Sequence, residues 1–179
     1  MSAYTVVLFL HIASAIAFFV AYGFEWVASA LLRRATTADQ ARSWLRVFRV
    51  SPPLSGVGLL LLIITGGYLA SLTHAMKQGW LMASFVAIFV VLGIGFAMIL
   101  PRTRAIRTAL SSGNEALSTD VVTRLQSSSL SVAVRVRFLL SIGIVFLMTV
   151  KPPLEISFAA LAGFLVLGIV TAIPTFSKP

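Results

Sequence analysis

The chain has 179 residues, of which 59% are hydrophobic and 11% charged, whereas soluble domains carry about 25% charged residues. A soluble fold could not bury this much apolar surface, and the complete lack of cysteine excludes disulfides, a thiolate nucleophile and Cys-type metal sites. The formal charge of +9 would suggest nucleic acid in a polar protein. Here the cations lie in loops beside apolar segments, so we expect anionic lipid headgroups, and no nucleic acid, as partners.

Five apolar segments divide the chain, each close to the ~20 residues that an α-helix needs to cross ~30 Å of hydrocarbon. No repeat or long linker separates them, so residues 1–179 are predicted to form one all-α transmembrane bundle with five spans. The alternative is four spans, in which the last two segments form a hairpin. The segments cover residues 4–32, 53–72, 80–100, 130–150 and 154–175.

The cations alternate between the two sides of this bundle. Only Lys77 and Lys151, of the 14 Lys and Arg residues, fall on the side of the N-terminus. The positive-inside rule then places the N-terminus outside and the C-terminus in the cytoplasm of a bacterial plasma membrane. The cytoplasmic cations would be Arg33, Arg34, Arg42, Arg46, Arg49, Arg102, Arg104, Arg107, Arg124, Arg135, Arg137 and Lys178.

The first segment carries the sharpest candidate for chemistry, His11, about 10 Å below the outer surface by the helical rise. Ionisable groups at membrane depth are candidates for function by default. A stripe on the same helix face could be a cofactor wall or a proton path, while the simpler alternative is that His11 bonds a neighbouring helix and fixes packing. The residues of this stripe are Ser14, Ala15, Phe18, Tyr22 and Glu25.

Glu25 lies near the inner interface, about 30 Å along the helix from Tyr4. Many arginines share this depth, so we expect a salt bridge to Arg102, Arg135 or Arg137 rather than a proton relay.

Two cytoplasmic connectors are expected, at about 33–52 and 101–130. In the first, Thr37 to Gln40 match an N-terminal capping box, and the following residues alternate arginine with apolar side chains. We expect a short amphipathic helix on the inner leaflet, ended by Pro52 and Pro53. In the second, residues 111–114 predict a break and 115–126 have a weak helical pattern, for which a solvated connector is favoured over packing against the bundle.

Small residues predict close helix packing at several places. The second segment has Gly56, Gly58 and the pair Gly66 and Gly67, and the third has Gly93 and Ala97. The last segment has Ala159 and Gly163 at the same four-residue spacing.

Residues near the outer ends of the helices are secondary candidates. His74 stands in a short loop, where a histidine is usually solvated. Met148 is close in depth to His11 and could be a second haem ligand, although a methionine in a helix is more often filler. Lys151 is expected to anchor the helix at the interface; its alternative is to face a cavity shared with His11, Tyr68 and Tyr4, where it would meet a ligand carboxylate. Arg135 and Arg137 are expected to snorkel toward the cytoplasm.

The chain has no Walker, G-x-S-x-G or H-E-x-x-H motif and no paired carboxylates. Catalysis without a cofactor is therefore not expected. We predict no metal site. The sequence does not identify a cofactor, and haem b is the candidate.

The stretch Leu10-His11-Ile12, then Phe24-Glu25-Trp26, the Arg33-Arg34 end and residues 148–152 together resemble small bacterial membrane proteins distantly similar to the HemJ and copper-resistance-D group. In HemJ-like proteins a histidine of the first helix is implicated in haem binding and porphyrinogen oxidation, so the resemblance implies this role for His11. Helix three has no Lys or His, unlike the later spans of HemJ members.

Three functions remain open from the sequence. The first is a non-catalytic protein that binds haem or another small ligand in a cavity near His11. The second is a transporter or channel subunit, with small-residue seams for helix motion or homo-oligomerisation and with Glu25 or His11 sensing protons. The third is a HemJ-like haem-dependent membrane oxidoreductase.

Overall fold

The computed structural model describes residues 2–111 and 117–173, and this part of the chain is helical throughout except for short connections. Lys178, residues 174–175 of the last apolar segment and most of the break expected at 111–114 lie outside the described residues. The α-helices are α1 (Ala3–Leu32), α2 (Ala38–Leu72), α3 (Gly79–Ile94), α4 (Leu100–Ser111), α5 (Thr119–Gln126), α6 (Ser128–Val150) and α7 (Leu154–Val170). A 3₁₀ turn, η1 (Ala75–Lys77), precedes α3, and a π-helical segment, η2 (Gly95–Ile99), joins α3 to α4.

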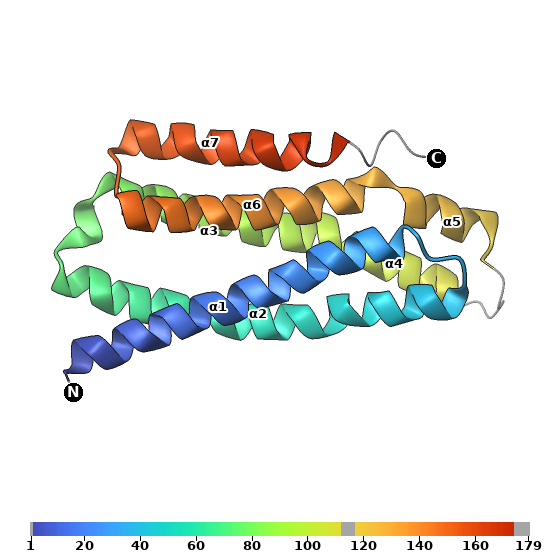
Figure 1. Ribbon diagram of the computed structural model, residues 1–179, viewed down its shortest axis with the longest axis horizontal. Coiled ribbons are helices and arrows are strands. Elements are labelled where there is room, and N and C mark those ends of the chain that lie inside the picture. The colour runs from blue at the N-terminus through green and yellow to red at the C-terminus, as the bar shows by residue number, and fades with distance from the viewer. Residues whose placement is uncertain (1, 112–116, 174–179) are drawn as a thin grey trace.

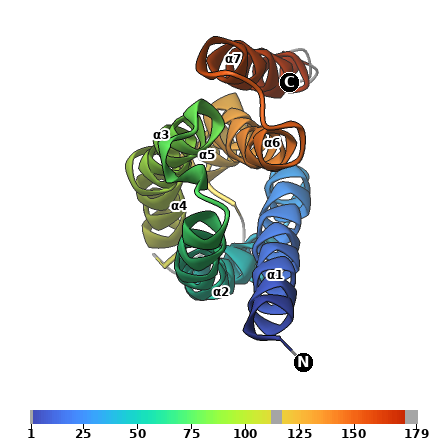
Figure 2. The same cartoon turned by 90° about the vertical axis from the view of Figure 1, so that its left-hand side faces the viewer.

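Successive long helices run in opposite directions and form a bundle (Figure 1). Within the described residues, four helices are long and apolar enough to cross a membrane: Ala3–Leu32, Ala38–Leu72, Gly79–Ser111 and Thr119–Val150. The shorter apolar helix α7 packs on α6 and α3, outside the ring of the other helices (Figure 2). The all-α bundle is therefore confirmed, with four long apolar candidate spans and a shorter apolar helix at the position of the fifth predicted span.

Local sequence explains where these helices begin and end. The Ser2 hydroxyl accepts a hydrogen bond from the Thr5 amide at 3.3 Å. Half of the predicted capping box is present: the Thr37 hydroxyl accepts from the Gln40 amide at 3.3 Å, while the Gln40 side chain accepts from the Thr36 amide instead of the Thr37 amide. Helix α6 ends at Lys151, whose left-handed φ of 53° is followed by Pro152 and Pro153, which cannot continue the helix.

The expected amphipathic helix of the first connector is not a separate element. Helix α2 continues from Ala38 through Pro52 and Pro53 to Leu72. Leu45 and Phe48 do not face lipid. They are buried in a core cluster at the end of the bundle where the two arginine-rich connectors lie. The two prolines therefore do not end the helix, because tertiary packing outweighs their local preference.

The second connector also packs against the bundle. Val121 and Leu125 of α5 are buried in the same cluster, with Ile106 and Leu110 of α4. The expectation of a solvated connector was wrong, because the apolar side of this short helix covers the apolar ends of its neighbours.

The small-residue seams lie partly elsewhere than predicted. Gly58 does allow close approach, since a Cβ there would lie 3.3 Å from the Ser14 carbonyl oxygen of α1. A Cβ on Gly163 would meet nothing within 4 Å, whereas one on Gly168 would lie 2.7 Å from Cα of Val136. Helix α7 therefore packs on α6 through Gly168, and Ala159 is exposed.

Candidate functional site

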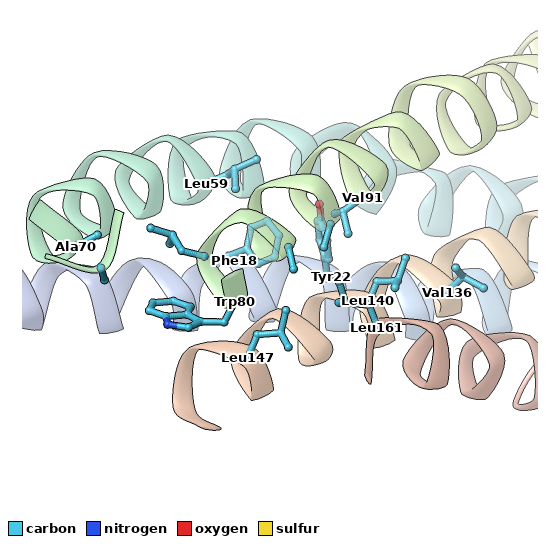
Figure 3. Close-up of a cluster of buried hydrophobic side chains, with 14 of the residues drawn as sticks. Phe18, Tyr22, Leu59, Ala70, Trp80, Val91, Val136, Leu140, Leu147 and Leu161 are labelled. Atoms are coloured by element: carbon cyan, nitrogen blue, oxygen red, sulfur yellow. The ribbon is translucent and has the colours of Figure 1, made fainter. Parts of the chain in front are cut away.

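The predicted stripe of α1 faces the inside of the bundle. Ser14, Phe18, Tyr22 and Glu25 are all buried. The rings of Phe18 and Tyr22 lie 4.3 Å apart between centroids, within the central core cluster (Figure 3). This stripe forms one wall of two cavities, and Leu59 of α2 lines both of them.

The larger cavity, which we call the His11 chamber, has a volume of about 310 Å³ and mostly apolar walls. Helices α1, α2, α3 and α6 contribute to it, and α2 and α3 scarcely touch each other along this side. Its polar or functional lining includes Tyr4, His11, Thr73, Trp80, Met148 and Lys151.

A hydrogen bond to α2 orients His11. Its Nδ1 lies 2.9 Å from the Thr65 hydroxyl oxygen, and this hydroxyl in turn donates to the Leu61 carbonyl at 2.6 Å. A hydroxyl that donates to Leu61 can accept from a hydrogen on Nδ1, and this tautomer would leave the lone pair of Nε2 free. Gly66 leaves room for the ring, since a Cβ there would lie 3.0 Å from Cε1 of His11.

The structure brings some predicted residues into this chamber and leaves others out. Met148 and Lys151 line it, and the Lys151 ammonium lies 5.9 Å from the centre of the Trp80 ring. His74 is exposed in the turn after α2 and lies outside the lining. Tyr68, expected to share the cavity, is 41% exposed and lies outside its lining too.

The second cavity, the Glu25 chamber, has a volume of about 140 Å³ and lies between α1, α2, α6 and the joined helices α3 and α4. At its wall Glu25, 1% exposed, forms an ion pair with Arg137, 7% exposed. The Ser51 hydroxyl donates to the other Glu25 oxygen at 2.5 Å, and the Arg137 guanidinium lies 4.1 Å from the centre of the Tyr22 ring. Arg137 therefore turns inward instead of snorkelling, while Arg135 stacks on Trp26 and donates to the Thr171 carbonyl.

The π-helical segment η2 makes room for this arginine. A Cβ on Gly95 would lie 2.9 Å from Nη1 of Arg137, so no larger residue fits without moving the guanidinium. Single π turns within α-helices are frequent at functional sites. Gly95, Phe96 and Ile99 of this segment line the Glu25 chamber.

Sequence reasoning placed Glu25 beside one of three arginines but did not find Ser51, Thr65 or Gly95. These residues become visible only when two helices are set in register, and a serine, a threonine or a glycine in an apolar segment has no pattern of its own. Groups of three or more His, Cys, Asp or Glu that could hold a metal ion do not occur in the described part of the chain.

Long apolar helices with ionisable residues turned into the bundle define a multi-pass integral membrane protein. Comparison with known proteins agrees. A model of the DUF2269 family, described as predicted integral membrane proteins, matches residues 5–152, and the chain belongs to this family. Neither the curated proteins nor the solved structures gave a match, and no link to HemJ or copper-resistance D is shown.

Proposed function

We propose that this chain is a ligand-binding protein of a bacterial plasma membrane and that the His11 chamber takes up a small apolar or amphiphilic molecule. The supporting observation is that His11, with its Nδ1 held by Thr65, lines a cavity of about 310 Å³ at the depth of the apolar helices. A large apolar pocket with few polar groups is the usual form of a ligand site. The loose contact between α2 and α3 offers entry from the lipid.

The proposed orientation has the N-terminus outside and the C-terminus in the cytoplasm. The turns between α2 and α3 and between α6 and α7, which carry Lys77 and Lys151, lie at the end of the bundle that holds the N-terminus, and the two connectors with their arginines lie at the other end (Figure 1). Helix α7, with 17 residues, would extend about 26 Å and is long enough to be a fifth span. The chamber of His11 then opens in the outer half of the membrane.

Haem b is the candidate ligand with the most definite chemistry. A histidine that ligates iron usually has its other ring nitrogen held by a hydrogen bond, and Nδ1 of His11 lies 2.9 Å from the Thr65 hydroxyl oxygen. The donor set fits: His11 would hold the iron, Met148 lines the same chamber as a candidate second ligand, and Lys151 would pair with a propionate. Bound haem would supply electron transfer or binding of a diatomic gas.

The visible spectrum of the detergent-purified protein tests this proposal. We expect a Soret band, either as isolated or after titration with haem, that is lost in His11→Ala. The matched control is His74→Ala, because His74 is an exposed histidine of the adjoining turn that does not line the chamber. The control should keep the full band.

A wild type that shows no Soret band after haem titration and removal of the unbound haem would exclude haem. The broader proposal is then tested by mass spectrometry of small molecules that copurify with the protein. A lipophilic compound present in wild type and depleted by Gly66→Leu, which would displace the His11 ring, supports it. Equal amounts in both proteins contradict it.

A further inference from the structure

We propose that the Glu25 chamber is a second binding site, separate from the His11 chamber, and that it takes a small oxyanion such as a carboxylate or a phosphate on Arg137. The chamber, with a volume of about 140 Å³, is bordered by this arginine and by the π-helical segment η2. A single water needs about 10–15 Å³ of such volume, so the chamber has room for a ligand of several heavy atoms.

The guanidinium of Arg137 has unused donors. It carries five N–H groups, and within the described residues its ion-pair partner is Glu25, which is reached through Nη2. Its Nε is buried without a hydrogen-bond partner, and the side chain as a whole is only 9% exposed. Buried donors are almost always satisfied, and Arg137 lines the chamber, so an occupant of the chamber that accepts hydrogen bonds is the partner we infer for it.

Charge favours an anion over a neutral acceptor. The end of the bundle beyond this chamber holds the arginines of both connectors, whereas Glu25, Asp39 and Asp120 are the carboxylates there among the described residues. The chamber wall itself carries one carboxylate and one guanidinium, Glu25 and Arg137, so the positive potential comes from the arginines beyond it and attracts anions toward this end of the bundle. The planar fork of an arginine also matches two oxygens of one oxyanion better than it matches water.

The environment holds the arginine in place for this role. Tyr22 stacks on the guanidinium at 4.1 Å, Glu25 is fixed by Ser51, and Gly95 leaves the space that Nη1 occupies. An oxyanion would thus compete with Glu25 for a cation that is already oriented.

Saturation-transfer NMR with acetate as the probe tests the site, on the full chain in nanodiscs of phosphatidylcholine. We expect saturable transfer to the acetate methyl group that phosphate displaces and that chloride at equal ionic strength does not. A second set of nanodiscs contains phosphatidylglycerol. Loss of the acetate signal there identifies a lipid headgroup as the source of the oxyanion, and a retained signal identifies a soluble one.

Four variants separate binding from folding. Arg137→Gln should abolish the signal, and Arg135→Gln is its matched control on the same helix, since Arg135 contacts Trp26 and Thr171 instead. Glu25→Gln removes the competing carboxylate and should tighten acetate binding about tenfold, the equivalent of one charge-assisted hydrogen bond. Gly56→Leu should weaken binding without touching the ion pair, because Gly56 lines the chamber and a Cβ there meets nothing within 4 Å.

The proposal is overturned if wild type gives no saturable signal with acetate or phosphate, in which case the chamber holds water only. It is also overturned if binding is unchanged in both Glu25→Gln and Gly56→Leu. These two variants decide the question even if Arg137→Gln does not fold.

Discussion

The ion pair between Glu25 and Arg137 is the most costly arrangement of single residues in this molecule. Two charges are held at 1% and 7% exposure, and a serine hydroxyl and an aromatic ring complete their surroundings. Such a pair adds little net stability over apolar residues, but removing one partner leaves a buried charge without compensation. A polar cluster of this kind is therefore better explained by specificity or by binding than by stability.

Loss of one partner of the Glu25–Arg137 pair should destabilise the protein more than replacement of both partners by apolar residues. Glu25→Ala should lower the free energy of unfolding by about 3 kcal/mol, because Arg137 then stays buried and unpaired. The double variant Glu25→Leu with Arg137→Met should recover most of the loss. Reversible unfolding in mixed micelles with increasing SDS measures both.

The exposed pair of Asp39 and Arg42 provides the control, since solvent screens it. Asp39→Ala should change the unfolding free energy much less than Glu25→Ala does. Equal losses in the two single variants, or a double variant no more stable than Glu25→Ala, would contradict the assignment of a tightly coupled buried pair.

At the scale of helices, packing is decided by where a backbone can approach its neighbour. The glycine pattern of the last helix predicted a seam at Ala159 and Gly163, but α7 meets α6 at Gly168. A four-residue spacing of small residues indicates a helix face that allows close packing, but it does not indicate whether another helix lies against that face.

Two substitutions on α7 test this difference. Gly168→Ala should destabilise the protein by about 1–3 kcal/mol, since the new Cβ would lie 2.7 Å from Cα of Val136. Gly163→Ala should leave the stability unchanged or raise it by up to about 1 kcal/mol, because its Cβ meets nothing within 4 Å and alanine favours a helix over glycine. Thermal unfolding in detergent compares them, and the reverse order of stability would show that α7 packs through the other face.

The sequence predicted the positions of most helices but few of the contacts between them, because such contacts depend on how two helices are aligned. Apolar length marked the spans, and the capping box at Thr37 marked the start of α2. The prolines at 52 and 53 suggested an end that α2 does not have, since burial of Leu45 and Phe48 keeps the helix continuous. For the site, the inward stripe of α1 followed from helical periodicity, whereas the bond from His11 to Thr65 depends on the register of two helices.

At the scale of the whole molecule, the two ends of the bundle differ in charge. The end with the N-terminus holds the turns after α2 and α6, in which Lys77 and Lys151 stand, and the opposite end holds the two connectors with their arginines (Figure 1). Lipid-facing helices join these ends, and both chambers lie inside between them. Which chamber faces the cytoplasm therefore follows from the orientation of the bundle, and so does the source from which each would draw its ligand.

Accessibility of single cysteines in intact cells measures that orientation most directly, and the chain has no native cysteine to interfere. With a membrane-impermeant maleimide, Ser2→Cys and Lys77→Cys should be labelled in spheroplasts, and Arg104→Cys only after the membrane is permeabilised. Labelling of Ser2→Cys and Arg104→Cys from the same side would contradict the account, because the first helix and the third would then not cross the membrane as proposed.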